Sequence, residues 1–186
     1  MGVHAKIKSP AVFVDRDGTI IAQVDDIISA SQLKILSGVS DGVRLLNRLG
    51  FLVIVITNQP VIGKGLTTMT KVKEMNKVIC NQLSKKGAVI DAFYVCPHRY
   101  MDHCACRKPK LGLIRAAIKK YKIDITNSSY IGDDMRDMET GKRAKLKTIL
   151  VKTGNAGLDK RYFDVKPDVI TRDFLSAAKS IARVRK

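Results

Sequence analysis

Short apolar runs that end in a polar residue constrain the fold of this chain more than any other feature. AVFVD (11–15) ends in Asp15, and FLVIVIT (51–57) ends in Thr57. Continuous runs rich in β-branched residues are typical of parallel strands buried on both faces. Similar runs lie at 89–95, 128–133, 147–151 and 167–170. The sequence therefore predicts a parallel sheet of about five or six strands.

Segments with helical spacing alternate with these runs. Ser40 is placed to cap a helix that runs to Leu49, and apolar residues recur every three or four positions over 72–83 and 113–121, with a last helix at 173–183. This alternation predicts an α/β, Rossmann-like, doubly wound sheet with helices on both faces. Ligands bind such sheets at the carboxyl ends of the strands. Asp15, Thr57 and Asp133 should therefore meet at one edge.

Length and composition favour a single domain over residues 1–186. The chain has 45% hydrophobic and 27% charged residues, and its length is sufficient for one core without disulfide support. It contains no apolar stretch long enough to span a bilayer, and MGVHAKIKSP (1–10) lacks the apolar run of a secretory signal. We expect a cytoplasmic monomer that has no membrane partner.

The charge of the chain is strongly positive, at +17 from 34 Lys and Arg against 17 Asp and Glu. Basic surfaces attract nucleic acid by releasing counterions from the phosphate backbone. Here the basic residues are spread over segments such as KVKEMNK and GKRAKLK, with few aromatic residues between them to stack on bases. We favour a solvated basic surface that steers small anionic substrates. Nucleic acid stays the less favoured partner.

The segment FVDRDGTI carries the first catalytic candidates. Asp15 and Asp17 stand two positions apart at the end of a predicted strand, before Gly18 and Thr19. Asp15 can attack a phosphorus atom, while Asp17 can protonate the leaving oxygen and later deprotonate a water molecule. In isolation DRDG is also favourable turn chemistry. These residues alone leave both readings open.

A divalent cation would complete such a site. Two ionised carboxylates would repel an anionic substrate, and Mg²⁺ prefers a few carboxylate oxygens together with phosphate and water. Asp133 and Asp134, in the segment YIGDD, follow a different predicted strand and are the obvious further ligands.

Residues 96–108, CPHRYMDHCACRK, predict a zinc-binding loop. Cys96, His98, Cys104 and Cys106 form two pairs with one-residue spacers, so each pair can chelate one ion from an extended segment. Three thiolates and one imidazole suit tetrahedral Zn²⁺ in a closed, structural site. His103 is a competing nitrogen ligand, although it is adjacent to Cys104.

Two alternatives for the cysteines carry less weight. Disulfides need an oxidising compartment, which nothing in the sequence supports. Cys80 stands apart in the helical pattern of 70–86 and is expected to be a small core or boundary residue.

Four motifs occur in a fixed order along the chain: DxDGT at residue 15, TN at residue 57, the lysine of RKPK, and GDD at residue 132. This set resembles that of the haloacid dehalogenase-like (HAD) phosphatases from residue 11 to about 155. The resemblance implies that Asp15 is a nucleophile that forms an aspartyl-phosphate and that Asp17 is its acid/base. It also implies that Thr57 and Asn58 hydrogen-bond the transferring phosphoryl group and that Lys108 neutralises its charge.

The same resemblance implies how Mg²⁺ is bound. The ligands would be the Asp15 carboxylate, the Asp17 main-chain carbonyl and Asp133, with Asp134 nearby, either bound directly or through water.

The arrangement C-x-H…C-x-C-R-K-P narrows the resemblance to HAD enzymes without a large cap domain. The enzymes that it resembles are those acting on heptose 1,7-bisphosphate in nucleotide-heptose synthesis and the histidinol-phosphate phosphatases. The metal-braced loop would then do part of a cap's work and present Arg107 to the distal part of the substrate.

The substrate is the least determined part of this reading. The turn PVIGKG after TNQ resembles that of the heptose enzymes, whereas the short loop between His98 and Cys104 resembles the histidinol-phosphate group. We favour the 7-phosphate of D-glycero-D-manno-heptose 1,7-bisphosphate. Histidinol phosphate, another sugar phosphate, a polynucleotide 3′-phosphate and a non-enzymatic, zinc-braced nucleic-acid-binding module are the alternatives. The expected substrate-binding residues are Gln23, Asp26, Asn58, Gln59 and Arg107.

Overall fold

Six parallel strands form one sheet in the computed structural model, which describes residues 8–159 and 163–184. The strand order is β3-β2-β1-β4-β5-β6. Their bounds are Ala11–Val14 (β1), Leu52–Asn58 (β2), Ala92–Cys96 (β3), Ser129–Gly132 (β4), Lys147–Val151 (β5) and Val169–Thr171 (β6). The predicted parallel sheet is confirmed. Residues 1–7, which include most of the segment compared with a secretory signal, lie outside the described residues.

The start of β3 differs most from the prediction, while the other strand boundaries differ by at most two residues. β3 begins at Ala92 and not at residue 89. The side-chain amide of Asn47 accepts a hydrogen bond from the Val89 N–H (2.8 Å) and donates one to the Val89 carbonyl (3.1 Å). These two bonds occupy the backbone groups that a ladder would need, so the chain joins the sheet only after Val89.

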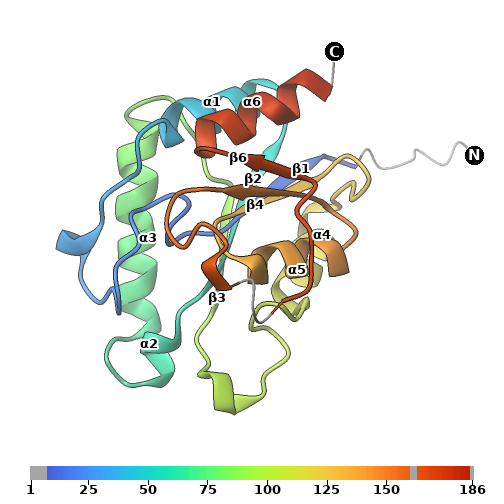
Figure 1. The fold of residues 1–186 in the computed structure, drawn as a ribbon. Coiled ribbons are helices and arrows are strands. Elements are labelled where there is room, and N and C mark those ends of the chain that lie inside the picture. The colour runs from blue at the N-terminus through green and yellow to red at the C-terminus, as the bar shows by residue number, and fades with distance from the viewer. Residues whose placement is uncertain (1–7, 160–162, 185–186) are drawn as a thin grey trace, which may run out of the picture.

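Helices cover both faces of the sheet, as predicted. They are Val39–Arg48 (α1), Pro60–Gly63 (α2), Met69–Ser84 (α3), Gly112–Tyr121 (α4), Met135–Arg143 (α5) and Phe174–Val184 (α6). Figure 1 shows α1 and α6 side by side at the top of the view, with α4 and α5 on the other side of the strands. The sequence did not predict α2 or α5. The expected cap at Ser40 is wrong, because α1 begins at Val39 and has Gly38 as its N-cap, two residues before Ser40.

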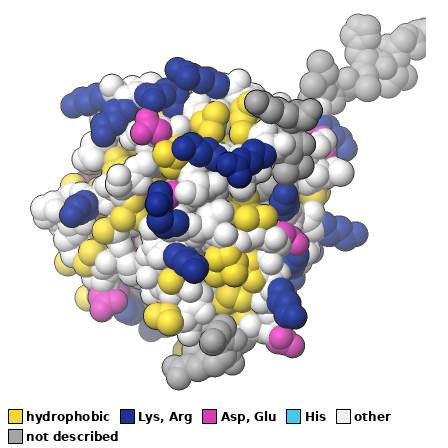
Figure 2. Space-filling model, turned by 45° about the horizontal axis from the view of Figure 1, so that its top comes forward, with side chains coloured by type: hydrophobic (Ala, Val, Ile, Leu, Met, Phe, Trp, Pro, Cys, Tyr) yellow, Lys and Arg dark blue, Asp and Glu magenta, His cyan; other side chains and the backbone are white. Residues whose placement is uncertain are grey.

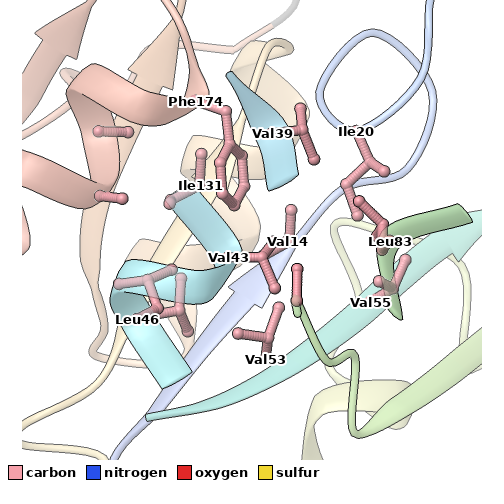
Figure 3. Close-up of a cluster of buried hydrophobic side chains, with 14 of the residues drawn as sticks. Val14, Ile20, Val39, Val43, Leu46, Val53, Val55, Leu83, Ile131 and Phe174 are labelled. Carbon is pink, nitrogen blue, oxygen red and sulfur yellow. The ribbon is translucent and has the colours of Figure 1, made fainter. Parts of the chain in front are cut away.

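The alternation of β1 side chains explains the two layers. Val12 and Val14 pack with residues of α1, α3 and α6, whereas Ala11 and Phe13 pack with residues of α4. All four are fully buried. Figure 3 shows the first cluster, in which Phe174 of α6 lies among side chains of α1 and the sheet. Full burial of a valine or phenylalanine side chain stabilises a fold by roughly 1.5–3 kcal/mol. Val12, Phe13 and Val14 therefore hold the centre of β1 rigidly in place.

Two longer connections leave the carboxyl end of the sheet, one from β1 to α1 and one from β3 to α4. Their only helical elements are short 3₁₀ turns, Ala30–Gln32 and Tyr100–Asp102. Neither connection forms a separate layer. In the part of the chain that the structure describes, the absence of a large cap agrees with the prediction.

The surface shows how the positive charge is distributed. In Figure 2, Lys and Arg side chains are scattered over the visible face among a smaller number of acidic ones. This matches the spread of basic segments along the sequence. Among residues 8–159 and 163–184, no helix has both the length and the apolar character needed to cross a membrane.

Candidate active site

Residues from four parts of the chain meet where the strands end. Asp15 follows β1, Thr57 lies in the last part of β2, Asp133 follows β4, and Lys108 comes from the loop before α4. All four line one cavity of about 220 Å³. The expected meeting of Asp15, Thr57 and Asp133 at one edge is therefore observed. It follows from parallel topology, which brings the carboxyl ends of strands together.

Lys108 lies between two carboxylates. Its Nζ is 2.8 Å from Asp15 Oδ1 and 2.7 Å from Asp137 Oδ1, and the residue is only 4% exposed. Burial opposes the charge of Lys108, but Asp137 and Asp15 more than offset it and raise its pKa. The ammonium group is therefore fixed beside the candidate nucleophile. A cation in this position would also attract a phosphoryl group.

Three carboxylates form a compact acidic cluster: Asp15, Asp133 and Asp137 offer oxygens that all lie within 4.8 Å of one another. Burial, followed by the charge of Asp137, raises the pKa of Asp15 to about 7. Burial and the charge of Asp15 likewise raise the pKa of Asp133 to about 7. A hard cation bound by oxygens would supply the missing positive charge, so this donor set fits Mg²⁺.

Asp137 was missed by the sequence analysis. It is fully buried in the first turn of α5, and burial raises its pKa to about 6 against the lowering effect of Lys108. Its Oδ2 is buried without a hydrogen-bond partner. The available signal was its spacing of four residues from Asp133, which places both at the start of one helix. Without a predicted helix at 135–143, that spacing carried no meaning.

The Asp133 carboxylate is held in a tight cradle. Thr19 Oγ1 donates to Oδ1 (2.9 Å), and the Asn155 N–H donates to Oδ2 (2.7 Å). A Cβ at Gly18 or at Gly154 would lie 2.2 Å from the same Oδ2, and both glycines have positive φ. Only glycine fits at these two positions, since any side chain would displace the carboxylate.

Asp134 lies outside the acidic cluster. It is the N-cap of α5, and its Oδ2 is 3.4 Å from an Arg136 nitrogen. Its Oδ1 is buried without a hydrogen-bond partner. Burial and the nearby Asp159 raise its pKa to about 7. In this structure the third carboxylate of the cluster is Asp137 and not Asp134.

Asp17 also lines the cavity and is held by side chains from the end of β2 and the residue that follows it. Gln59 Nε2 donates to Asp17 Oδ2 at 2.7 Å, and Thr57 Oγ1 donates to the same oxygen at 3.3 Å. The side chain of Gln59, expected to bind substrate, is thus engaged with Asp17. Asn58 accepts a hydrogen bond from the Lys108 N–H at 3.0 Å. Asn58 therefore ties the loop that carries Lys108 to the end of β2.

The mouth of the cavity brings together the remaining predicted residues. Gln23 and Asp26 are exposed and line the cavity, and Asp26 is ion-paired with Lys64 at 2.9 Å. Arg107 and Arg136 also line it. Burial, followed by the charge of Arg136, lowers the pKa of Arg107. Two guanidinium groups therefore face the same space near the acidic cluster.

The cysteine–histidine loop forms a second cluster. The Sγ atoms of Cys96, Cys104 and Cys106 lie 3.3–3.7 Å apart, and His98 Nδ1 is 3.2 Å from Cys106 Sγ and 3.7 Å from Cys96 Sγ. Ligands ~2.3 Å from a tetrahedral Zn²⁺ would be spaced by roughly these distances. None of the four cysteines forms a disulfide. His103 is exposed and is not part of the cluster.

This loop is connected to the active site through the chain. The Arg107 N–H donates to Cys104 Sγ at 3.3 Å, and Arg107 Nη1 donates to the His98 carbonyl at 3.2 Å. Burial opposes ionisation of Cys104, but the N–H groups of Arg107 and Cys106 lower its pKa to about 7. Arg107 is thus positioned directly by the cysteine–histidine cluster, and Lys108 is the next residue along the chain.

A parallel sheet with an aspartate pair, a lysine and a second acidic motif at its carboxyl edge defines the class of the HAD-like phosphatases. A HAD-hydrolase-like family model matches residues 105–177. The D-glycero-beta-D-manno-heptose-1,7-bisphosphate 7-phosphatase of Haemophilus influenzae is 34% identical over 77% of this chain and 82% of that protein. The enzyme of the same name from Escherichia coli K12 is 32% identical over 78% and 80%.

A solved structure agrees with these relatives. The D,D-heptose 1,7-bisphosphate phosphatase of B. bronchiseptica, complexed with magnesium and phosphate, superposes with a TM-score of 0.87 at 26% identity, covering 94% of this chain and 99% of that one. The chain belongs to the heptose-bisphosphate phosphatase family of HAD-like phosphoric monoester hydrolases.

Proposed function

We propose that this enzyme hydrolyses the 7-phosphate of D-glycero-D-manno-heptose 1,7-bisphosphate through a covalent intermediate on Asp15. The observation that carries the proposal is the arrangement of Asp15 beside Lys108 Nζ (2.8 Å), with Asp17 lining the same cavity. A nucleophile, a fixed cation and an acid/base are the parts that stepwise phosphoryl transfer needs. The named relatives act on this heptose bisphosphate.

In the first step, a carboxylate oxygen of Asp15 attacks the phosphorus atom. The bond between phosphorus and the sugar oxygen breaks, and Asp17 gives its proton to that oxygen, so that the sugar leaves as an alcohol. Lys108 stabilises the negative charge on the phosphoryl oxygens. The product on the enzyme is an aspartyl-phosphate at Asp15.

In the second step, a water molecule attacks the phosphorus of the aspartyl-phosphate. Asp17, now ionised, takes a proton from that water, and the bond from phosphorus to the Asp15 oxygen breaks. Inorganic phosphate leaves, and the Asp15 carboxylate is restored. Asp17 thus needs one orientation that serves both steps.

Two metals are part of the proposal. Asp15 and Asp133, together with Asp137 and the Asp17 carbonyl, would hold Mg²⁺, which supplies positive charge where the phosphate binds. The magnesium and phosphate in the B. bronchiseptica structure support this assignment. Cys96, His98, Cys104 and Cys106 would hold a structural Zn²⁺ that keeps Arg107 and Lys108 in place. The spacing of their ligand atoms supports this second assignment.

The mouth of the cavity supports a substrate with a second anionic group. Arg107 and Arg136 present two cations there, and an anionic group between them would relieve their repulsion. A bisphosphate has such a group far from the reacting phosphate, and histidinol phosphate does not. The second candidate, histidinol phosphate, rests on the short loop between His98 and Cys104. The monomeric state, the single domain over 1–186 and the cytoplasmic location also stay proposals based on the sequence.

Phosphate release with Mg²⁺ tests the substrate. The panel contains both anomers of heptose 1,7-bisphosphate, histidinol phosphate and a 3′-phosphorylated oligonucleotide. We expect one heptose anomer to be hydrolysed with the highest kcat/KM. Equal rates on all four would contradict the heptose assignment, and Asp15→Asn provides the inactive control.

A further inference from the structure

The largest fully buried side chain of the described chain is a charged one, that of Arg16. A buried guanidinium is costly unless its N–H groups are paired. Arg16 stands between Asp15 and Asp17 in the chain, and its own N–H donates to Asp15 Oδ1 at 2.7 Å. Neither step of the proposed reaction gives Arg16 a role. Its burial therefore needs an explanation.

The guanidinium group is directed at Asp17. Nε is 3.3 Å from Asp17 Oδ1 and 3.2 Å from Oδ2, and Nη2 is 3.0 Å from Oδ1. Such a fork engages both carboxylate oxygens at once and fixes the plane of the carboxylate, which a single donor cannot do. The pair lies at the edge of the cavity, since the Asp17 side chain is 19% exposed while that of Arg16 is 0% exposed.

The fork itself is anchored from a distant element. Arg16 Nη1 donates to Asn76 Oδ1 at 3.2 Å, and Asn76 is buried in α3. Asn76 does not line the catalytic cavity. The guanidinium is thus fixed at one end by the helix and holds the Asp17 carboxylate with the other. Gln59 and Thr57 add donors to Asp17 Oδ2 only.

We propose that Arg16, anchored by Asn76, is a positioning residue that sets the orientation in which Asp17 gives and takes its proton. This inference rests on the proposed acid/base function of Asp17. Proton transfer requires hydrogen-bond distance and alignment to the reacting oxygen, and small displacements of a catalytic group reduce the rate strongly. Without the fork, the Asp17 carboxylate would keep contacts on one oxygen and could rotate about them.

The consequence depends on the leaving group. A sugar alkoxide is a poor leaving group and needs the proton of Asp17 as the bond to phosphorus breaks. The nitrophenolate of 4-nitrophenyl phosphate leaves without a proton. kcat/KM reports only the steps up to release of the leaving group, so misorientation of Asp17 should lower kcat/KM for the sugar phosphate far more than for the aryl phosphate. A residue that merely stabilises the fold would lower both by the same factor.

The test compares kcat/KM for heptose 1,7-bisphosphate and 4-nitrophenyl phosphate in wild type and in Arg16→Met, with saturating Mg²⁺. We expect the sugar phosphate to lose ~10²-fold, within the range of general acid catalysis, and the aryl phosphate to lose at least about tenfold less. With the aryl phosphate, aspartyl-phosphate should accumulate, because Asp17 also serves as base. Equal losses on the two substrates would overturn the inference.

Three further variants keep the test decisive. Asn76→Ala removes the anchor and leaves Arg16 in place, so it should show the same selectivity with a smaller loss; unchanged kinetics would contradict the role of the anchor. Arg16→Lys keeps the charge but not the fork, and full recovery of activity would overturn positioning by the fork. Arg48→Met removes an exposed arginine of α1 and should change neither kcat/KM value. If Arg48→Met lowered the two values as Arg16→Met does, the inference about Arg16 would be overturned.

Asp17→Asn separates this inference from the proposed function. If Asp17→Asn shows no preference for the aryl phosphate, the acid/base role of Asp17 is wrong, and the inference fails with it. If Asp17→Asn shows that preference but a folded Arg16→Met does not, only the inference about Arg16 fails.

Discussion

Replacing Lys108 with methionine should destabilise the folded protein strongly. Lys108 is 4% exposed, and its Nζ lies within 2.8 Å of both Asp15 Oδ1 and Asp137 Oδ1. Methionine keeps most of the buried volume, so the loss is mainly electrostatic. Removing one partner of a buried ion pair costs ~3–5 kcal/mol. That is a large part of the ~5–15 kcal/mol that stabilises a typical domain.

Urea unfolding followed by circular dichroism at pH 7, without added Mg²⁺, measures this cost. Lys119→Met, on the exposed side of α4, is the matched control and should change the free energy of unfolding by less than about 0.5 kcal/mol. An Asp137→Asn background gives a second check. There the cost of Lys108→Met should fall by at least ~1 kcal/mol, because only one carboxylate is left unpaired. A Lys108→Met cost below about 1 kcal/mol, or equal costs in both backgrounds, would refute this account of the buried site.

Three other predictions follow from the Asp133 cradle and the cysteine loop. Thr19→Val removes the 2.9 Å bond to Asp133 and should lower the free energy of unfolding by ~1–3 kcal/mol, with weaker Mg²⁺ binding by calorimetry; unaltered binding would contradict the cradle. Gly154→Ala places a Cβ 2.2 Å from Asp133 Oδ2 and should likewise weaken Mg²⁺ binding, whereas tight binding would show that the carboxylate can shift. Elemental analysis should find one zinc ion per chain, and Cys104→Ser should lose it and lower the melting temperature; a metal-free wild type would refute the zinc assignment.

The fold could be predicted because its signals are local. Each buried strand is a continuous apolar run, and parallel topology alone brings the ends of β1, β2 and β4 together. The boundary of β3 failed for a non-local reason. The side chain of Asn47, 42 positions away, binds the backbone of Val89, and no local pattern reveals such a contact.

The candidate site was predictable where a motif carries it and not where packing does. Asp15, Asp133 and Lys108 stand in recognisable motifs. Asp137 depends on a helix whose sequence, MRDMETGKR, is too polar to reveal a buried face. Arg16 illustrates the limit most clearly, since charged residues are normally exposed. Its burial is compensated by Asp17 next to it and by Asn76, 60 positions along the chain.

The central claim, that Asp15 becomes phosphorylated, can be tested directly. Enzyme mixed with Mg²⁺ and heptose 1,7-bisphosphate is quenched during turnover, reduced with borohydride, digested and analysed by mass spectrometry. Borohydride converts an aspartyl-phosphate to homoserine, so the account predicts homoserine at position 15 in the wild type and none in Asp15→Asn. Reduction at Asp17 or Asp133 instead, or turnover that leaves position 15 unmodified, would contradict it.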